Sequence, residues 1–317
     1  MVSADRMSLA RIPIVAGPTA SGKTSFALEQ AERLGLEIIN ADSLLVYRHF
    51  DIGTAKPTAQ EMGSVPHHLI NIRDPLESFT AADFVRAVHG LAADLHRRNQ
   101  KALIVGGTHF YLKALCLGLW DAPETQPEFR KTLEPVETSE LFERLRTLDP
   151  TYATKIGVAD RYRIIRALEI LEFSPKKPSQ LESEAAQRQP DPRFPLLWID
   201  RNPDEIEARI QARIQQMLAA GLIQETRSLL EHYPQARALH SVGYRQVVEF
   251  LQGTPPPGRA VRPGTEGLSD EIQLATRQLV KSQRTFLRGF EFAERFLFEE
   301  DRLKPVSYTH LTLPTKA

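Results

Sequence analysis

The sequence predicts an α/β protein in which helices flank a central parallel sheet, with a helical insertion domain within the chain. Three observations support this class. A glycine-rich motif near the N-terminus joins a short apolar stretch to a helical pattern, uninterrupted apolar runs occur at residues 102–105 and 196–199, and the chain between residues 121 and 194 is helical and proline-rich. Apolar runs without alternation are typical of parallel strands that are covered on both faces.

The first motif is Gly17-Pro18-Thr19-Ala20-Ser21-Gly22-Lys23-Thr24, which matches the pattern G-x-x-x-x-G-K-[ST] at all four fixed positions. Ile12 to Val15 lead into it as a strand, and a helical pattern follows it. The backbone N–H groups of such a loop and the N-terminus of its helix bind phosphate oxygens, while Lys23 adds a positive charge and Thr24 is placed to bind Mg²⁺. The motif predicts a P-loop NTPase-like core with the nucleotide-binding or ATP-binding site that is typical of this pattern, although it does not specify the reaction.

Polar residues follow the predicted strands at one edge of the sheet. Residues 37–40 predict a short buried strand that leads to Asp42, and residues 102–105 predict a strand that leads to Thr108. Ligands of doubly wound sheets bind beyond the carboxyl ends of the strands, so we expect both side chains near the phosphate loop. Residues 47–57 predict a loop over the site, residues 67–72 a third strand, and Thr80 the N-cap of a helix over 81–98.

The middle of the chain predicts a separate domain. Residues 121–194 contain helical patterns at 140–148 and 160–173 but no convincing strand, and residues 194–199 again resemble a buried strand. We therefore predict a core formed by residues 1–120 and 195–305, with a helical insertion domain over 121–194. Further helices are expected over 203–220, from 241 onward, and over 269–290. Residues 306–317 resemble translated adapter sequence and are predicted to be a non-native tail.

Composition narrows the class of protein. Forty basic and forty acidic side chains cancel, so a nucleic-acid partner would need a local basic surface. The single cysteine, Cys116, excludes an intramolecular disulfide framework and cysteine-based zinc sites. No apolar run approaches the length of a membrane span, and the N-terminus has no signal-peptide core. We expect a cytoplasmic enzyme that does not bind membranes and acts as a monomer.

Two aspartates, Asp42 and Asp200, have alternative roles that imply different reactions. Asp42 could be a turn residue, a metal ligand or a general base. Asp200 follows the apolar residues 196–199, which is where a kinase or NTPase places the aspartate that holds Mg²⁺. A P-loop kinase or NTPase is therefore one hypothesis for the function.

The last predicted helix carries a basic stripe. Its cationic residues are spaced by four, three and four positions and share one helical face, whereas residues 275–290 contain no acid: Arg277, Lys281, Arg284 and Arg288. A charged stripe is commonly a solvated face, but four unpaired positive charges also suit a phosphate backbone. A nucleic-acid-binding protein with a relict phosphate loop is therefore a further hypothesis.

A longer set of motifs follows in chain order: the phosphate loop, Ala41-Asp42-Ser43, Asp51-Ile52-Gly53-Thr54-Ala55-Lys56-Pro57, Gly106-Gly107-Thr108, Arg166-Ala167-Leu168-Glu169, Gly243-Tyr244-Arg245-Gln246 and Thr276-Arg277-Gln278-Leu279. Together these motifs resemble the bacterial tRNA dimethylallyltransferases, the IPP transferase family. These enzymes prenylate N6 of adenosine 37, next to the tRNA anticodon. The motifs extend from the phosphate loop to about Arg288, which is nearly the whole chain.

The resemblance implies a chemistry for the site. Residues Gly17 to Thr24 would hold the diphosphate of dimethylallyl diphosphate in place of ATP, with Mg²⁺ on Thr24. Lys23 and Arg213 would neutralise the charge that grows on the leaving group. Asp42 would accept the N6 proton as general base, and Thr108 would position the nucleophile or the tRNA. The target adenine would flip out of the anticodon loop to reach this centre.

The resemblance also implies a surface for the anticodon stem-loop of tRNA. The implied contacts, together with the cations of the basic stripe, are Asp42, Ser43, Leu44, Leu45, Thr108, Arg130, Tyr162, Arg163, Ile164, Ile165, Arg166, His240, Ser241, Val242, Gly243, Tyr244, Arg245, Arg277, Lys281 and Arg284. Single-stranded loop recognition is the expected mode. The chain departs from the family pattern at Leu45, at Gly157-Val158-Ala159, at Ser282 and at Phe286, outside the expected catalytic residues.

Overall fold

The computed structural model describes residues 11–254, 261–299 and 302–305. The chain divides into two compact units, one formed by Met1–Lys113 with Asp191–Ala317 and the other by Ala114–Pro190. The second unit begins seven residues before the insertion domain predicted over 121–194 and ends four residues before its predicted end. The predicted tail, residues 306–317, lies outside the described residues. No helix in the described parts of the chain is long and apolar enough to cross a membrane.

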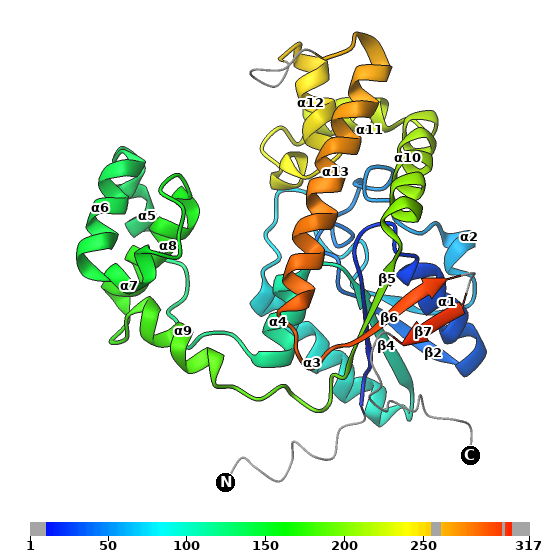
Figure 1. The fold of residues 1–317 in the computed structure, drawn as a ribbon, viewed down its shortest axis with the longest axis horizontal. Coiled ribbons are helices and arrows are strands. Elements are labelled where there is room, and N and C mark those ends of the chain that lie inside the picture. The colour runs from blue at the N-terminus through cyan, green and yellow to red at the C-terminus, as the bar shows by residue number, and fades with distance from the viewer. Residues whose placement is uncertain (1–10, 255–260, 300–301, 306–317) are drawn as a thin grey trace. The chain divides into compact units, whose positions relative to one another are not determined.

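The first unit contains a seven-stranded sheet in the order β3-β2-β4-β1-β5-β6-β7 (Figure 1). All neighbouring strands are parallel except β6 and β7. The strands are β1 (Ile14–Ala16), β2 (Leu36–Asn40), β3 (His67–His68), β4 (Lys101–Gly106), β5 (Leu196–Arg201), β6 (Glu294–Glu299) and β7 (Arg302–Pro305). The predicted fold class is therefore confirmed, although the two last strands were not predicted.

The third strand is shorter than the sequence predicted. β3 ends at His68, whereas the apolar pattern suggested a strand through Ile72. Leu69 and Asn71 adopt positive φ angles of 61° and 56°. These left-handed conformations are incompatible with an extended strand, so the chain turns instead. The adjoining residues 47–57 contain no helix or strand, as predicted.

Helices cover both faces of the sheet because successive crossovers run in opposite directions. The helix α1 (Lys23–Leu34) connects β1 to β2, and α3 (Ala81–Arg97) connects β3 to β4 in the reverse direction across the sheet, so right-handed connections place them on opposite faces. Phe26, Ala27 and Ala31 of α1 pack on Val15 and Val105. The predicted N-cap of α3 is confirmed, since Thr80 Oγ1 accepts a hydrogen bond from Asp83 N at 3.2 Å.

The C-terminal half of the first unit adds a layer of helices. It contains α10 (Pro203–Ala219), α11 (Leu222–His232), the short 3₁₀ helix η2 (Arg237–His240), α12 (Tyr244–Gln252) and α13 (Gly264–Arg288), while α2 (Ala59–Met62) and α4 (His109–Leu117) lie earlier in the chain. Ile206, Ile210 and Ile214 of α10 pack with Leu268 and Ile272 of α13 in one apolar cluster. α10 and α13 therefore form one packed body, and Figure 1 shows them side by side.

The unit Ala114–Pro190 is built from helices alone among its described elements. They are α5 (Pro127–Leu133), α6 (Thr138–Leu148), α7 (Pro150–Ala153), α8 (Arg161–Phe173) and α9 (Pro178–Ala186), of which only α6 and α8 were predicted. Leu141, Leu145, Ile164 and Leu168 form the centre of its apolar core. This unit thus has a core of its own.

Candidate active site

The phosphate loop joins the end of β1 to the start of α1 and depends on glycine at two positions. A Cβ added to Gly17 would lie 2.4 Å from Ile199 O and 2.6 Å from Ser21 Oγ, so no larger residue fits there. Gly22, the N-cap of α1, has a φ of 88°, a left-handed conformation that favours glycine. The N-terminus of α1 therefore opens directly on the loop, as an anion-binding site requires.

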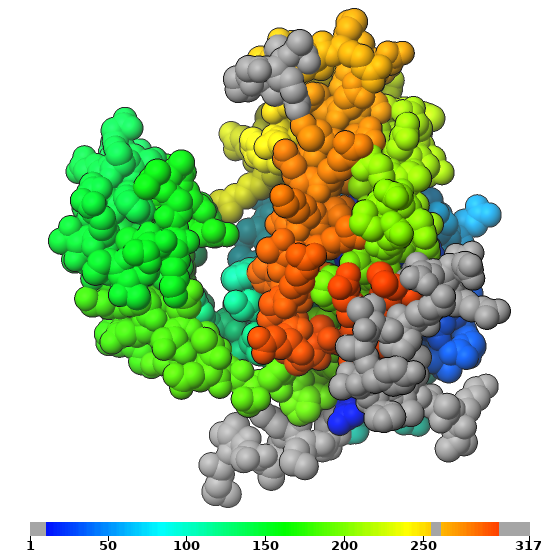
Figure 2. All heavy atoms as spheres, viewed as in Figure 1, coloured from blue at the N-terminus to red at the C-terminus, as the bar shows by residue number. Residues whose placement is uncertain are grey.

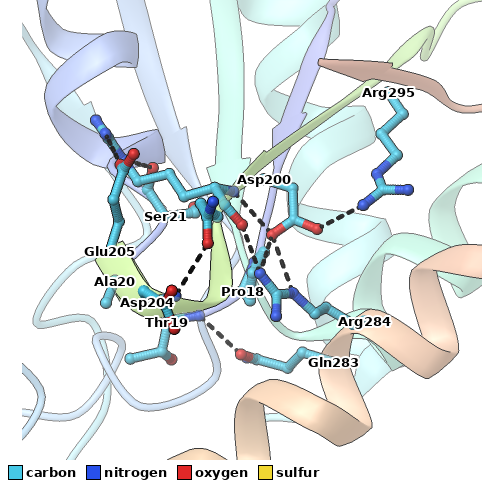
Figure 3. A network of polar contacts seen from close by, with 12 residues as sticks. Pro18, Thr19, Ala20, Ser21, Asp200, Asp204, Glu205, Gln283, Arg284 and Arg295 are labelled. Carbon is cyan, nitrogen blue, oxygen red and sulfur yellow. Dashed lines mark hydrogen bonds and ion pairs between the residues drawn. The ribbon is translucent and has the colours of Figure 1, made fainter. Parts of the chain in front are cut away.

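Side chains from distant elements hold the outer side of this loop (Figure 3). Arg201 Nε donates to Ser21 O at 2.9 Å, and Arg209 Nε donates to Ala20 O at 3.0 Å. Gln283 of α13 accepts from Thr19 N at 2.8 Å through its Oε1 atom. These bonds fix loop carbonyls and one loop amide before any ligand binds. None of these three residues was identified from the sequence, because each lies at least 180 positions from the loop residue that it contacts.

Three charged side chains come together beside the loop: Lys23, Asp42 and Arg213. Burial lowers the pKa of Lys23 to about 8, with Asp42 opposing this shift and Arg213 adding to it. Burial also lowers the pKa of Arg213, again opposed by Asp42. The two cations and the carboxylate therefore share one electrostatic environment, although they belong to α1, to the segment after β2 and to α10.

Hydrogen bonds fix the segment that carries Asp42. Asn40 Oδ1 accepts from Asp42 N at 3.0 Å, and Asp42 Oδ1 accepts from Leu44 N at 2.9 Å. Thr108 Oγ1 accepts from Ser43 N at 2.9 Å and donates to Ser43 Oγ at 3.2 Å. The structure thus brings Asp42 and Thr108 to the same sheet edge, as the strand pattern predicted. Asn40 was not identified from the sequence, although it is the last residue of the predicted strand.

The loop over the site is held from outside by Glu225 of α11. Its carboxylate accepts from three successive backbone amides, Asp51 N at 3.1 Å, Ile52 N at 2.8 Å and Gly53 N at 3.1 Å, and from Tyr244 Oη at 2.6 Å. The loop in turn accepts a hydrogen bond from Arg213 Nη2 at Thr54 O, with a length of 3.1 Å. Glu225 therefore holds the backbone segment that positions Arg213, a role that the sequence did not indicate.

His109 is a further residue that the sequence analysis missed. It follows Thr108 at the start of α4, and its ring lies 4.9 Å from the ring of Phe286. Its buried Nε2 atom has no hydrogen-bond partner among the described residues. Burial and the nearby charge of Lys23 lower the pKa of His109 to about 4, so the ring is neutral at physiological pH.

Asp200 is fully engaged by arginines, which weighs against the kinase or NTPase hypothesis. Its carboxylate is only 1% exposed. Oδ1 accepts from Arg284 Nε at 3.0 Å and Nη2 at 2.8 Å, and Oδ2 accepts from Arg295 Nη2 at 3.1 Å (Figure 3). The expectation that Asp200 could hold Mg²⁺ is therefore corrected, because both oxygens already bind guanidinium groups.

The basic stripe of α13 is also less free than its sequence suggested. Arg284 is bound to Asp200, and Arg277 donates from Nε to Glu207 Oε2 at 2.6 Å. Lys281 and Arg288 have no recorded ion pair with described residues. The expectation of four unpaired charges is therefore wrong for two of the four, because the acids come from β5 and α10. Figure 2 shows the side chains of α13 exposed along the helix.

The predicted tRNA contacts of the second unit are organised around a buried carboxylate. Glu169 is fully buried and accepts from Arg130 Nε at 3.0 Å and Nη2 at 2.9 Å, and it also pairs with Arg166. Arg130 lies 5.6 Å from the ring centroid of Tyr162, whose side chain is exposed. Arg163 is exposed as well. This unit therefore presents an aromatic ring supported by a fixed guanidinium group.

Two of the predicted tRNA contacts have buried side chains. Ile164 has no exposed surface and packs in the core of the second unit. Tyr244 is equally buried and bonds to Glu225. As side-chain contacts these two predictions are corrected, because apolar packing and a buried hydrogen bond occupy the side chains. His240 and Arg245, from the same predicted segment as Tyr244, are exposed.

The residues present suit a metal ion that is bound chiefly through the ligand. No group of three or more histidine, cysteine, aspartate or glutamate side chains within the described ranges could hold one. The exposed side chain of Thr24 lies in the first turn of α1, at the phosphate loop. Mg²⁺ commonly binds one or two protein oxygens together with substrate phosphates and water, so the hydroxyl of Thr24 fits this mode.

Fold and site together define a P-loop α/β protein whose phosphate loop adjoins a carboxylate and two partly buried cations. Residues 45–290 match the family described as IPP transferase. The chain is 39% identical to tRNA dimethylallyltransferase 1 of Citrifermentans bemidjiense over 89% of this chain and 90% of that protein. It is 38% identical to the tRNA dimethylallyltransferase of Francisella tularensis subsp. novicida, over 92% and 94% respectively.

Solved structures agree with these relatives. The full-length tRNA isopentenylpyrophosphate transferase from Bacillus halodurans is similar with a TM-score of 0.62 and 32% identity, over 90% of this chain and 89% of that chain. A eukaryotic dimethylallyltransferase acting on tRNA is similar with a TM-score of 0.75 and 26% identity, over 90% of this chain and 74% of that chain. The chain belongs to the IPP transferase family, and the resemblance drawn from its motifs is confirmed.

Proposed function

We propose that this protein transfers the dimethylallyl group from dimethylallyl diphosphate to N6 of adenosine 37 in the anticodon loop of tRNA, and that it releases diphosphate. The observation that carries the proposal is the grouping of Lys23, Asp42 and Arg213 around a preformed phosphate loop. A transfer to an amine needs an anion site for the leaving group and a base for the proton. This grouping supplies both within one environment.

The phosphate loop holds the diphosphate in this proposal. Its amides and the N-terminus of α1 face the ligand, while Arg201 and Arg209 hold loop carbonyls from the other side. Lys23 and Arg213 neutralise the negative charge that develops as the bond between the allylic carbon and the diphosphate oxygen breaks. Since both cations are partly buried, their interaction with that charge is screened less than it would be in water.

Asp42 acts as the general base. The exocyclic amine of adenine is a weak nucleophile because its lone pair is delocalised into the ring. As the new carbon–nitrogen bond forms, N6 becomes positively charged and its proton passes to the carboxylate of Asp42. Thr108, bonded to the Ser43 backbone and hydroxyl, positions the nucleophile beside this carboxylate. The adenine reaches the site by flipping out of the anticodon loop.

The hydroxyl of Thr24 would hold Mg²⁺ together with the diphosphate, and the ion would supply further positive charge for the leaving group. The hydroxyl of Thr24 is the ligand that the chain offers at the loop. Asp42 remains assigned to the proton because its Oδ1 atom also fixes the turn at Leu44, which holds the carboxylate in one orientation.

The tRNA contacts belong to exposed residues of several elements. Tyr162 and Arg163 of α8, His240 and Arg245 around the start of α12, and Lys281 of α13 are exposed and suit an RNA surface. Aromatic rings and arginines recognise single-stranded loops by stacking and by phosphate contacts. The unit Ala114–Pro190 thus contributes part of the tRNA surface in this proposal. That the enzyme acts as a monomer in the cytoplasm stays a prediction.

Transfer of label from dimethylallyl diphosphate to an unmodified tRNA tests the proposal. Asp42→Ala is expected to lower the rate of transfer at least about a hundredfold while tRNA still binds, as for loss of a general base. Asp74→Ala is the matched control, because Asp74 Oδ1 makes the same bond to the amide two residues on, Leu76 N at 3.2 Å, outside the phosphate-loop site. Normal turnover by the Asp42 variant would remove this residue from the mechanism, and turnover of ATP without transfer by the unmodified protein would refute the function.

A further inference from the structure

A basic cavity adjoins the phosphate loop through Arg201, which lines the cavity and also bonds to Ser21 O. It has a volume of about 280 Å³, and its lining includes Arg201, Asn202, Arg284, Arg288 and Arg295. These residues come from the end of β5, the start of α10, the end of α13 and β6. Leu297, two positions after Arg295 on β6, closes one wall. Four arginines therefore surround one small space, and none of its described lining residues is acidic.

Three arginines of the cavity are held in place by ion pairs, and two of the four, Arg288 and Arg295, keep donors without a described partner. Asp200 forms ion pairs with Arg284 and Arg295, and Arg201 pairs with Glu205 at 2.9 Å. Arg288 is exposed and has no recorded ion pair among the described residues. The Nε atom of Arg295 is buried without a hydrogen-bond partner in the described part of the chain. Arg288 and Arg295 thus bring donors to the cavity lining that an oxyanion could bind.

The charges near the cavity also favour an anion. Four guanidinium groups line it, and the acids that pair with them are Asp200 and Glu205. Asn202, the N-cap of α10, places the positive end of that helix at the cavity wall. Because Asp200 is buried behind the arginines and Glu205 is paired, the accessible side of the cavity is the positive one.

The cavity and the phosphate loop share one residue. Arg201 donates from Nε to Ser21 O, and a Cβ on Gly22 would lie 3.3 Å from its Nη2 atom. Arg284, which also lines the cavity, is bonded to this residue, since its Nη2 atom donates to Arg201 O at 2.7 Å. A ligand in this cavity would therefore lie behind the loop and would not occupy the diphosphate site, which is formed by the loop amides.

We propose that this cavity binds a phosphate group through Arg288 and Arg295. The planar fork of arginine matches the oxygens of phosphate, and these two side chains, from α13 and β6, line a volume that a phosphate group can enter. Such a group can come from the backbone of bound tRNA or from a free phosphate anion. The tRNA source rests on the proposed function, whereas the free anion does not.

The first arm of the test measures tRNA affinity as a function of salt. Arg288→Glu is expected to lower the salt slope by about 0.7 to 0.9, the contribution of one phosphate contact, which corresponds to about a threefold smaller loss of affinity between 50 and 200 mM salt. Arg33→Glu is the matched control, because Arg33 is an exposed arginine on α1 whose recorded bond is to Gln30 and which makes the same change of charge.

In the second arm, the full chain is titrated with inorganic phosphate alone, and calorimetry measures the number of phosphate sites. Two sites are expected in the unmodified protein and in Arg33→Glu, namely the phosphate loop and the cavity, and one site in Arg288→Glu. A melting experiment on each variant confirms that it is folded; Arg288→Lys, which keeps the charge but removes the fork, should show intermediate binding.

The outcomes separate the sources. A reduced salt slope of tRNA affinity in Arg288→Glu assigns the cavity to a backbone phosphate of tRNA. Loss of the second inorganic phosphate site in the same variant assigns the cavity to a free anion. Either result supports the proposal. An unchanged slope together with one phosphate site in the unmodified protein would overturn it. If the unmodified protein binds no tRNA, the proposed function fails, and the phosphate titration still decides the cavity.

Discussion

Replacing Arg284 by alanine should destabilise the first unit, because it leaves a buried carboxylate without its main partner. Asp200 is 1% exposed and accepts two bonds from Arg284, at 3.0 and 2.8 Å. Removing one partner of a buried ion pair costs about 3–5 kcal/mol. Arg295 and the amide of Arg201 still bind the carboxylate, at 3.1 and 2.9 Å, and reduce that cost. We therefore expect a loss of about 2–4 kcal/mol in the free energy of unfolding.

A single tryptophan makes this change measurable. The chain has two tryptophans, Trp120 in the second unit and Trp198 in β5. In a Trp120→Phe background, fluorescence during urea unfolding reports the first unit alone, two positions from Asp200. This separation matters because a chain with two units need not unfold in one step.

Two further variants test the reasoning. Adding Asp200→Asn to Arg284→Ala should restore most of the loss, because the uncompensated charge is gone. Arg277→Ala is the control: its pair with Glu207 is on the same helix face but exposed, 52% for Arg277 and 34% for Glu207, so it should cost about 0–1 kcal/mol. Equal costs for the two arginine variants, or no recovery in the double variant, would refute the assignment of Arg284 to the buried network.

Three other predictions concern the diphosphate site. The pKa of Lys23 is lowered to about 8, so this side chain loses its charge as the pH rises through that value. The affinity for inorganic diphosphate, measured by calorimetry, should therefore fall near pH 8, and this fall should be absent in Lys23→Arg. A fall that persists in the variant would assign the titration to another group. Arg209→Ala removes the bond to Ala20 O and should weaken diphosphate binding about threefold to tenfold, with tRNA affinity unchanged; equal affinity would show that the loop needs no such support. Glu225→Gln should lower the transfer rate and the melting temperature more than Tyr244→Phe, because the carboxylate serves three amides and the phenol only one bond. The reverse order would contradict this role.

Local chemistry allowed the sequence to determine most of the sheet and the phosphate loop. The loop requires glycine at positions 17 and 22 and a lysine beside the second one, and these are visible in eight consecutive residues. The cap at Thr80 and the strands β1, β2, β4 and β5 were equally predictable, since a cap motif and an apolar run are local signals. β6 and β7 were missed because they follow the last helix in a mixed charged and apolar segment without period.

Only the tertiary structure decided which charges are free. Helical spacing showed that Arg277 and Arg284 share a face, but it could not show that Glu207 and Asp200, 70 and 84 positions away, lie against that face. Glu225 likewise binds amides more than 170 positions earlier. Periodicity reports the side of an element on which a residue lies, whereas partners and burial depend on elements brought together by the fold. The sequence therefore determined where the phosphate loop lies, and the packing of α10, α11 and α13 decided which side chains hold that loop and which remain available to a ligand.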